Sequence, residues 1–294
     1  MHKEQLFLRQ LICFSIVLTL YLSRLSGTIG NEAIITHFCI MQYTLKKSLG
    51  QHFLIDENVC RKIVEHVGHR QGMSLVEVGP GGGAITKYLL QWDDIDYKAI
   101  EIDEEKMQYL NKTYPSIQGK IILQDILKAD IPFAGHFNLV GNFPYNISSP
   151  ILFKVLEWEE HVDEVIGMFQ KEVALRVASG PGSKVYGILS VLMQAFYKVE
   201  YLFDVNENCF NPPPKVKSGV LRFTNLGNPY GIINKRKFII LVKAAFNQRR
   251  KTLRNALKST LPPGEHNEPL MDKRAEQLTV ADFVALHKKY QHDT

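Results

Sequence analysis

The segment Asn142-Phe143-Pro144-Tyr145 places a carboxamide, a proline and a phenol next to one another. The preceding run, Phe137–Gly141, is apolar and predicts a short buried strand. Ligands of open α/β sheets bind beyond the carboxyl ends of the strands. A carboxamide accepts and donates hydrogen bonds, a proline stiffens a turn, and a phenol ring offers a flat face to a base. The segment therefore predicts a seat for a planar amine, although in isolation it could be a plain turn.

A glycine turn, Gly79-Pro80-Gly81-Gly82-Gly83, lies between a strand expected at Ser74–Val78 and a helix expected at Ala84–Leu90. Glycines let the backbone approach a ligand closely. The turn lacks the Gly-x-Gly-x-x-Gly pattern of dinucleotide enzymes, and no Walker lysine follows it, so a cofactor without phosphates fits better. We expect S-adenosylmethionine, bound at Gly79 and Gly81.

Two carboxylates and a histidine complete the candidate cofactor site. Glu101 ends the next predicted strand about twenty residues after the glycine turn, which is the spacing of a carboxylate that binds ribose hydroxyls. Asp125 follows the third strand and is placed to accept a hydrogen bond from an adenine amino group, but it could instead cap a helix or lie in a solvated turn. His52 lies in a Gly-Gln-His-Phe loop without an acidic neighbour, so it either contacts the cofactor or is structural.

Methyl transfer to an adenine amine is the chemistry that these residues suit. That amine is a poor nucleophile because its lone pair is delocalised into the ring. Acceptors at the Asn142 side-chain oxygen and the Phe143 carbonyl would orient both N–H groups, Tyr145 would stack on the base, and Pro144 would hold the turn. No strong base is needed, because the amine becomes acidic once the methyl group has arrived.

Strands and helices are expected to alternate around these residues. Asp56–Asn58 opens a predicted amphipathic helix, and Glu104–Tyr109 forms another. The other expected strands are Tyr97–Ile100, Lys120–Leu123, Val165–Phe169, Lys198–Phe203 and Gly219–Phe223, of which the last closes the sheet; the other expected helices are Pro150–Leu156, Lys171–Ala178 and Gly187–Ala195. Cys209–Val216 is expected to be a rigid loop. The alternation predicts a mostly parallel sheet.

A change of composition follows the last strand. Asn225–Asn234 contains glycine and proline and is interpreted as a linker, and the chain beyond it is helical with many basic residues. The predicted fold is therefore α/β, a Rossmann-like methyltransferase sheet with a small all-helical C-terminal domain. The expected parts are a non-fold extension at residues 1–41, the sheet domain at 42–226 and the helical domain at 227–294.

The composition is that of a globular protein. Hydrophobic residues make up 45% and charged residues 22% of the 294 positions, which excludes global disorder. The net charge of +5 is compatible with an anionic partner. Cys13, Cys39, Cys60 and Cys209 form no Cys-x-x-Cys pair, so we expect neither a metal site nor a disulfide framework.

The first forty residues differ from the rest. The apolar run Leu11–Leu22 follows basic residues and resembles a signal peptide or a short anchor. It is short for a bilayer crossing, which takes ~20 residues, and Ser26-Gly27-Thr28 is a poor cleavage site. We favour a third interpretation, in which the cellular protein begins at or near Met41, because the predicted cofactor is intracellular. We therefore expect a cytoplasmic protein without membrane association.

Six ordered blocks carry a family resemblance. They are Lys47–Leu54, Glu77–Gly81, Asn142–Pro150, Gln170–Val173, Phe210–Val216 and Phe246–Thr252. Together they resemble the KsgA-type small-subunit ribosomal RNA adenine dimethyltransferases, from about Lys46 to the C-terminal helices. The resemblance implies N6,N6-dimethylation of two adjacent adenosines in the 3′-terminal hairpin loop of 16S rRNA, with S-adenosylmethionine as methyl donor, late in small-subunit biogenesis.

The resemblance also implies partners and contacts. The rRNA would lie in an immature ribosomal subunit, and we expect the protein to be a monomer. Cofactor contacts would fall at His52, Leu54, Gly79, Glu101, Asp125 and Asn142. Two residues depart from the family pattern: His52 stands where many members have asparagine, and Phe143 where leucine is usual. The first keeps a polar contact possible, and the second should matter little if residue 143 acts through its carbonyl.

Basic residues in the C-terminal segment suit binding of the RNA backbone, because each neutralised phosphate adds to a salt-dependent affinity. Arg249, Arg250, Lys251, Arg254 and Lys258 are expected on one helix, and Lys171 and Arg176 are candidates for the same surface. Each could instead lie on a solvated helix face. The target base must leave its stack to reach the seat. Phe169 and Phe210 are candidates for walls of the base pocket, with core packing as the alternative.

Two other functions stay open at this stage. The related family that methylates large-subunit rRNA generally lacks the Gln-Lys-Glu-Val and Pro-Pro-Pro-Lys-Val segments present here. A non-catalytic ribosome-assembly or RNA-binding factor could keep the fold, but Glu101, Asp125 and the Asn142–Tyr145 segment argue against lost activity. A small-molecule methyltransferase would not need the basic helical segment.

Overall fold

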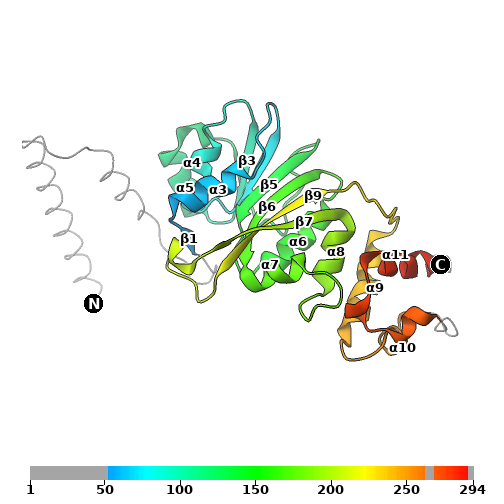
Figure 1. Ribbon diagram of the computed structural model, residues 1–294. Helices are drawn as coiled ribbons and strands as arrows, with labels where there is room; N and C mark the ends of the chain where they lie inside the picture. The colour runs from blue at the N-terminus through cyan, green and yellow to red at the C-terminus, as the bar shows by residue number, and fades with distance from the viewer. Residues whose placement is uncertain (1–51, 262–267, 291–294) are drawn as a thin grey trace, which may run out of the picture. The chain divides into compact units, whose positions relative to one another are not determined.

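The computed structural model describes residues 52–261 and 268–290, which belong to a single unit (Figure 1). The extension expected at residues 1–41 lies outside the described residues and stays a prediction. The described chain forms a seven-stranded sheet with the order β4-β3-β2-β5-β6-β9-β7. Its strands are β2 (Ser74–Val78), β3 (Asp96–Glu101), β4 (Ile121–Leu123), β5 (Phe137–Asn142), β6 (Val162–Gln170), β7 (Tyr197–Val205) and β9 (Ser218–Asn225).

The sheet is mostly parallel, as predicted, and the α/β fold class is confirmed. Neighbouring strands from β4 through β6 pair in parallel, while β9 is antiparallel to both β6 and β7. The expectation that Gly219–Phe223 closes the sheet is wrong, because β9 lies inside it and β7 forms the edge. The burial explains this order: Val220, Leu221 and Phe223 are fully buried, as in an inner strand, whereas most of β7 is partly exposed.

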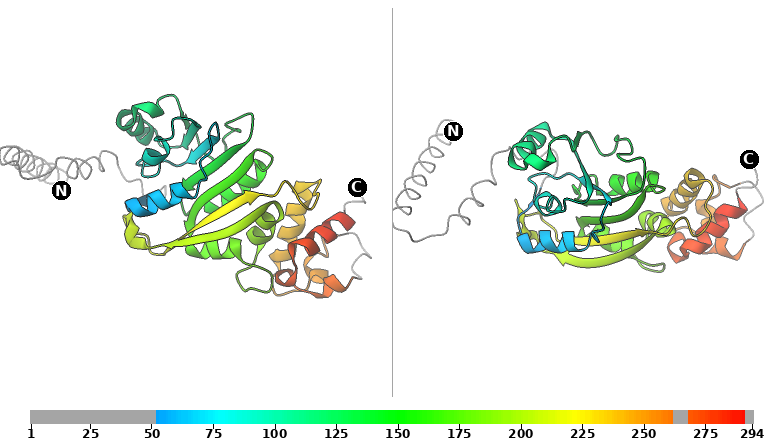
Figure 2. Two further views of the ribbon diagram at one scale, coloured as in Figure 1. Left: turned by 45° about the horizontal axis from the view of Figure 1, so that its top comes forward. Right: turned by 90° about the horizontal axis from the view of Figure 1, so that it is seen from above.

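Helices cover both faces of the sheet (Figures 1 and 2). They are α3 (Glu57–Glu65), α4 (Thr86–Leu89), α5 (Glu104–Thr113), α6 (Ser148–Glu157), α7 (Lys171–Ala178) and α8 (Ile188–Phe196). Because strand side chains alternate between faces, Leu75 joins a buried cluster with α3, α4 and α5, while Val76 and Val78 join a second cluster with α6 and α8. The sheet is therefore the middle layer of three.

Side-chain caps fix where two of these helices begin. The Asp56 carboxylate accepts hydrogen bonds from the backbone N–H groups of Asn58 and Val59, at 2.9 and 3.0 Å, and so begins α3. The Asp103 carboxylate accepts from the N–H of Glu105 at 3.2 Å and begins α5. Since Asp103 stands two residues after the end of β3, this cap holds the connection that carries Glu101 at the carboxyl edge of the sheet.

A two-stranded antiparallel sheet joins distant parts of the chain. β1 (Phe53–Leu54) pairs with β8 (Phe210–Asn211), and the backbone N–H of Ile55 donates to the Cys209 carbonyl at 2.8 Å. The segment expected to be only a rigid loop, Cys209–Val216, therefore begins with backbone pairing. This pairing places the His52 loop beside the residues that follow Asn211.

The C-terminal part is helical, as predicted. Its elements are α9 (Lys235–Asn247), α10 (Leu253–Ala256), 3₁₀ turns at Pro269–Asp272 and Ala275–Gln277, and α11 (Val280–Lys289). Phe238 and Val242 of α9 are fully buried in the same cluster as α6 and α8, so these helices share the core on that face of the sheet. The boundary expected between residues 226 and 227 stays a prediction.

The prediction of one helix for the basic residues Arg249 to Lys258 is wrong. α9 ends at Asn247, and Gln248 leaves the helical conformation with φ −117° and ψ 65°. Thr252 is extended and begins the separate helix α10, while the N–H of Leu253 donates to the Lys273 carbonyl at 2.8 Å. The break allows Leu253 to be fully buried, which outweighs the favourable propensity for a continuous helix.

Candidate active site

The glycine turn, Glu101 and Asn142 meet at one edge of the sheet. They follow or end β2, β3 and β5, which are neighbours in parallel pairing. Parallel strands bring their carboxyl ends to the same edge, where ligands of such sheets bind. The topology therefore assembles residues that are far apart in the sequence.

The glycine turn requires its glycines. Gly79, Gly81 and Gly83 have φ values of +66°, +57° and +81°, a region that other residues rarely adopt. A Cβ added to Gly81 would lie 3.3 Å from Cε1 of Phe53, and one added to Gly83 would lie 2.6 Å from Cε2 of Tyr114. At Gly81 and Gly83 these side chains occupy the space of a Cβ, whereas a Cβ on Gly79 would meet nothing within 4 Å. The turn is therefore open to a ligand at Gly79.

Glu101 is held in one orientation. Its Oε1 accepts hydrogen bonds from the backbone N–H groups of Ile102 and Asp103, both at 2.9 Å, and its Oε2 accepts from the N–H of Gly81 at 3.2 Å. The residue is only 4% exposed. A carboxylate fixed beside the glycine turn can accept ribose hydroxyls without further ordering, which is the role expected from its spacing.

Beneath the turn lies a second carboxyl group, which the sequence analysis did not assign. Glu77 is 2% exposed, and its Oε2 accepts from the Thr86 hydroxyl at 2.8 Å and the Tyr97 hydroxyl at 2.5 Å. Burial raises the pKa of Glu77 to about 7, although the hydrogen bonds from Tyr97 and Thr86 act in the opposite direction and the Glu101 charge adds to the rise. Glu77 joins β2, β3 and α4 below the cofactor site.

Asn142 presents an open acceptor at the edge of the sheet. Its Nδ2 donates to the His52 carbonyl at 3.2 Å, and among the described residues nothing donates to its Oδ1. The backbone carbonyl of Phe143 likewise accepts no hydrogen bond from a described residue. Two acceptors with fixed positions therefore stand next to each other, as required to hold the two N–H groups of an amine.

Tyr145 is fixed at its hydroxyl and beside its ring. The hydroxyl lies 2.5 Å from the Ser218 Oγ, and the ring centroid lies 5.5 Å from that of His52. Burial raises the pKa of Tyr145, and the hydrogen bond with Ser218 opposes that rise, so the ring stays a neutral phenol at pH 7. A fixed, neutral ring is suited to stacking on a base.

The segment is a turn, as the plainer interpretation of the sequence expects, and its role as a seat for an amine stays a prediction. The N–H of Ile147 donates to the Pro144 carbonyl at 3.1 Å, and the Ser148 hydroxyl donates to the Tyr145 carbonyl at 3.1 Å. The turn leads directly into α6. Its geometry fixes where the carboxamide and the phenol lie, so the turn is compatible with the predicted seat.

Phe143 fills space that two glycines leave. Its ring is fully buried and lies 5.2 Å from the Phe169 ring. A Cβ on Gly141 would lie 2.8 Å from Phe143 Cε1, and one on Gly167 would lie 2.5 Å from Cε2. The phenylalanine that departs from the family pattern is therefore accommodated in the core. Phe169 and Phe210 are also buried, at 0% and 2% exposure, so both serve the core and neither walls a pocket.

The remaining cofactor candidates differ in what they offer. Oδ1 of Asp125 accepts a hydrogen bond from the N–H of Leu127 at 3.0 Å, so Asp125 stabilises a turn, as the alternative interpretation expects. Its Oδ2 has no partner among the described residues. Gln124, next to it, donates its N–H to the Glu101 carbonyl at 2.9 Å. Leu54 is 4% exposed and pairs with Phe210, so it contributes packing.

His52 lies beside the seat predicted for the target amine at Asn142–Tyr145, the target seat. Its Nδ1 is 2.8 Å from the Pro212 carbonyl, and its own carbonyl accepts from Asn142. Ser218 and Pro212 were not expected from the sequence. The block Phe210–Val216 includes Pro212 and ends two residues before Ser218, so the block itself was the available signal. The expected residues His52, Asn142 and Tyr145 are thus brought together, and Phe53 connects them to Gly81.

Most of the expected RNA-binding residues are paired within the protein. Lys171 binds Asp204 at 2.5 Å, Arg176 binds Glu172 at 2.9 Å, and Arg254 binds Asp272 at 2.7 Å. Arg249 donates to the carbonyls of Lys184 and Tyr186, the latter at 3.1 Å.

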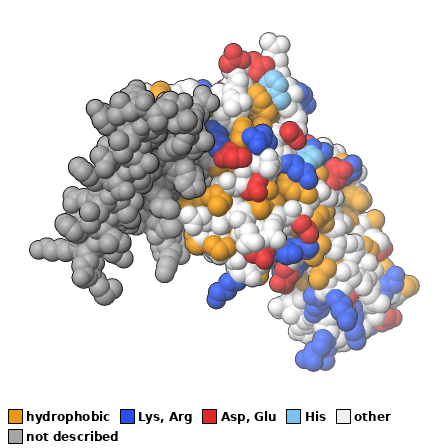
Figure 3. Space-filling model, turned by 60° about the vertical axis from the view of Figure 1, so that its left-hand side comes forward, with side chains coloured by type: hydrophobic (Ala, Val, Ile, Leu, Met, Phe, Trp, Pro, Cys, Tyr) orange, Lys and Arg blue, Asp and Glu red, His pale blue; other side chains and the backbone are white. Residues whose placement is uncertain are grey.

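Arg250 and Lys251 differ, because neither side chain has a partner among the described residues. Both are exposed. Lys and Arg side chains gather at the bottom of the face drawn in Figure 3. Lys258 is likewise exposed without a partner among the described residues, so the structure leaves three of the expected residues, Arg250, Lys251 and Lys258, available for phosphate contacts.

Two negative findings concern the described residues alone. They hold no group of three or more His, Cys, Asp or Glu side chains that could bind a metal ion. None of their helices is long and apolar enough to cross a membrane.

Comparison with known proteins places this geometry in context. The family model described as ribosomal RNA adenine dimethylase matches residues 42–292. A protein of Cytophaga hutchinsonii named ribosomal RNA small subunit methyltransferase A is 49% identical over 245 residues, which are 82% of this chain and 95% of that one. A protein of the same name from Flavobacterium johnsoniae is 48% identical over 252 residues, 84% of this chain and 96% of that one.

Solved structures show the same fold. A dimethyladenosine transferase from Plasmodium falciparum superposes with a TM-score of 0.68 and 24% identity, covering 80% of this chain and 96% of the other. The 23S rRNA methyltransferase ErmE superposes with a TM-score of 0.59 and 22% identity, covering 82% of this chain and all of the other. At these identities the likeness concerns the fold alone.

Proposed function

The chain belongs to the ribosomal RNA adenine dimethylase family, and from this we propose that it dimethylates the N6 amines of two adjacent adenosines in the 3′-terminal hairpin loop of 16S rRNA. The family expected from the six sequence blocks is confirmed, and the protein is a methyltransferase that uses S-adenosylmethionine. The alternative of a large-subunit enzyme is not favoured, because the relatives that are 48% and 49% identical over more than four fifths of the chain are named as small-subunit methyltransferases.

One observation carries the proposal: the Asn142 carboxamide is fixed through its nitrogen and open at its oxygen. When bound, S-adenosylmethionine supplies an electrophilic methyl group. Asn142 Oδ1 and the Phe143 carbonyl would each accept one N–H of the adenine amine and draw electron density onto its nitrogen. The adenine nitrogen would accept the methyl group from the cofactor's sulfur, and the amine proton would then leave to water. Positioning and electrostatics are sufficient for this step.

Cofactor and base would bind to different parts of the edge. The glycine turn at Gly79 and Gly81, the Glu101 carboxylate, Asp125 and the His52–Leu54 segment would contact the cofactor. Tyr145, held by Ser218, would stack on the base. We propose that residues 42–226 form this methyltransferase domain and that residues 227–294 form a helical RNA-binding domain. The RNA would contact Arg250 and Lys251 directly.

We further propose an immature small subunit as the substrate, a monomeric enzyme and action in the cytoplasm. The basic turn, Arg249–Lys251, follows α9, and the target seat precedes α6, and a folded rRNA within a subunit could reach both. Late action in small-subunit biogenesis follows from a substrate whose hairpin loop is already formed.

The test is methylation of purified subunits. The full chain with labelled S-adenosylmethionine should label small subunits from cells that lack this dimethylation, and digestion followed by mass spectrometry should yield N6,N6-dimethyladenosine. Large subunits prepared in the same way serve as the control. Absence of label in adenosine of competent small subunits would refute the proposed function, and label confined to large subunits would favour the alternative enzyme.

A further inference from the structure

We propose that Lys235 and Glu159 are positioning residues that fix the basic turn Arg249–Lys251 relative to the target seat. Their ion pair locks the start of α9 to the chain just beyond the end of α6. The lock would allow one rRNA molecule to occupy the seat and the basic turn at the same time. This inference rests on the proposed function, since it concerns how the same substrate is held.

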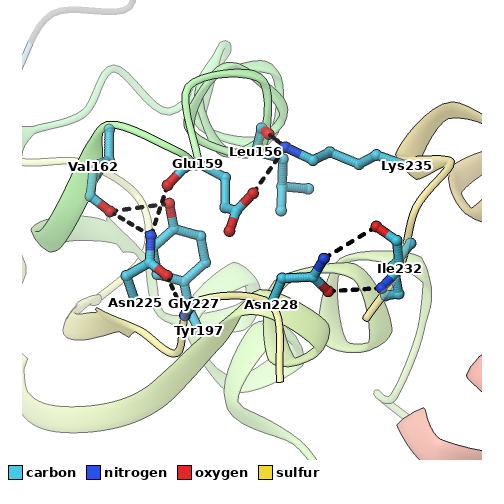
Figure 4. A network of polar contacts seen from close by, with 9 residues as sticks. All are labelled: Leu156, Glu159, Val162, Tyr197, Asn225, Gly227, Asn228, Ile232 and Lys235. Carbon is cyan, nitrogen blue, oxygen red and sulfur yellow. Dashed lines mark hydrogen bonds and ion pairs between the residues drawn. The ribbon is translucent and has the colours of Figure 1, made fainter. Parts of the chain in front are cut away.

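The ion pair is built into the structure rather than lying free on the surface. Lys235 Nζ lies 2.9 Å from Glu159 Oε2, and the Glu159 side chain is only 6% exposed. The same Nζ donates to the Leu156 carbonyl at 3.0 Å (Figure 4). It also lies 5.4 Å from the centroid of the Phe196 ring. The Lys235 side chain is 26% exposed, so the pair is partly buried, and its additional hydrogen bond to a backbone carbonyl ties the start of α9 to the end of α6.

Amide side chains fix the segment that precedes the lock. Asn225 Nδ2 donates to the carbonyls of Glu159 and Val162, at 2.6 and 2.9 Å, and Asn225 Oδ1 accepts from the N–H of Gly227 at 2.7 Å (Figure 4). Asn228 exchanges two hydrogen bonds with the backbone of Ile232, at 2.9 and 3.0 Å. The segment interpreted as a linker, Asn225–Asn234, is therefore fastened along its length.

Two helices lead from the lock to the two surfaces. α6 begins at Ser148, three residues after Tyr145, and its ten residues span about 15 Å. α9 begins at Lys235 and ends at Asn247, just before the basic turn, and its thirteen residues span about 20 Å. The lock connects the far end of α6 with the near end of α9, so the seat and the basic turn are joined through two helices.

The basic turn is fixed at its other side as well. Arg249 donates to the Lys184 and Tyr186 carbonyls, which precede α8, and it lies 3.8 Å from Glu276. Arg249, expected to bind RNA, thus holds the turn in place, while Arg250 and Lys251 stay available. Both ends of α9 are therefore restrained against the sheet domain.

Restraint matters because the substrate must bind at two places. When two contacts are rigidly connected, the second forms at a high effective concentration, and that advantage is lost when the connection loosens. Without the lock we expect kcat/KM for small subunits to fall on the order of tenfold. The affinity for S-adenosylmethionine should not change, because the cofactor residues lie at the opposite end of α6.

The experiment uses the full chain with the double variant Lys235→Met and Glu159→Gln. Removing both partners leaves no unpaired buried charge, which protects the fold. Lys235→Arg keeps the charge and should restore most of the rate. Lys198→Met with Glu200→Gln is the matched control, because Lys198 and Glu200 form an exposed ion pair at 3.1 Å and the double change likewise leaves the net charge unaltered.

Coupling to the basic turn separates positioning from plain stability. Arg250→Ala with Lys251→Ala should lower kcat/KM clearly in the wild-type background and much less in the Lys235→Met, Glu159→Gln background. Equal losses in the two backgrounds, or a wild-type kcat/KM in the lock variant, would overturn the inference even if the melting temperature fell. A wild-type enzyme that labels no adenosine would instead contradict the proposed function.

Discussion

The carboxyl edge of the sheet and the basic turn after α9 differ in which polar side-chain atoms have partners within the protein. At the edge, Asn142 and Asp125 each use one polar atom to hold their position and leave another open. Around the basic turn, Arg249 and Arg254 use their guanidinium groups within the protein. Arg250 and Lys251, between them, have no such partner.

The difference shows what each region contributes. In the proposed mechanism, methyl transfer at the sheet edge depends on a few oriented acceptors, so loss of one acceptor atom should slow it strongly. The proposed RNA contacts at the basic turn depend on charges near phosphates, so each residue should contribute modestly and in a salt-dependent manner. Each prediction below tests one side of this contrast.

The largest effect is expected for Asn142→Ala. The substitution removes the open acceptor at the target seat, so the single-turnover rate of methyl transfer should fall roughly 100- to 1,000-fold, which corresponds to about 3–4 kcal/mol. The dissociation constant of S-adenosylmethionine, measured by calorimetry, should stay within a few-fold of the wild-type value. A rate close to that of the wild type would remove Asn142 from the mechanism.

The residues at the carboxyl edge of the sheet could be predicted from the sequence, because the strand order places the strand ends together. Gly79, Glu101 and Asn142 stand at the ends of predictable strands, and parallel pairing leaves them little freedom of position. Ser218 and Pro212 could not be predicted in the same way. They reach the target seat only because β1 pairs with β8 and because β9 lies between β6 and β7. No local sequence pattern predicts either arrangement.

The basic residues were harder to assign for a different reason. A run of arginines and lysines specifies charge but not which side chains find acids nearby. Lys171 meets Asp204 and Arg254 meets Asp272, in each case across a separation in sequence that only the fold brings together. The helix break after Asn247 had the same origin, since burial of Leu253 overrides local helix propensity.

The second prediction concerns the effect of the buried Glu77 carboxyl group on the free energy of unfolding. The pKa of Glu77 rises from 4.5 to about 7 on folding. Between these values the folded state holds a proton that the unfolded state releases, so this group lowers stability as pH rises from about 4.5 to 7, by about 3 kcal/mol in total. Glu77→Gln should therefore gain stability relative to the wild type over that range.

Urea denaturation at pH 5 and pH 8 measures this change. The difference between Glu77→Gln and wild type should increase with pH, whereas the control Glu172→Gln, at an exposed helix pair, should show a nearly constant difference. An equal difference at both pH values would mean that Glu77 is charged throughout.

The third prediction concerns the contribution of the Glu101 carboxylate to cofactor affinity. In Glu101→Gln the amide oxygen can still accept from Ile102 and Asp103, but the new NH₂ group faces the Gly81 N–H, donor against donor. It also removes the charge that would bind ribose hydroxyls. Loss of a hydrogen bond to a charged group costs about 1.5–3 kcal/mol, so the S-adenosylmethionine dissociation constant should rise roughly 10- to 100-fold. Calorimetric titration that gives an unchanged constant would exclude a cofactor contact at Glu101.

The smallest effects are expected at the basic turn, where basic side chains with and without partners in the protein can be compared directly. Arg250→Ala and Lys251→Ala should each reduce the slope of log affinity against log salt by about 0.7–0.9, since each removes one phosphate contact. Arg254→Ala removes an equal charge that is already paired with Asp272 at 2.7 Å, so its slope should stay near that of the wild type. Filter binding of small-subunit rRNA over a salt series measures all three. If Arg254→Ala lowered the slope as much as Arg250→Ala, pairing within the protein would not decide which charges meet the RNA, and affinity at this surface would follow total charge alone.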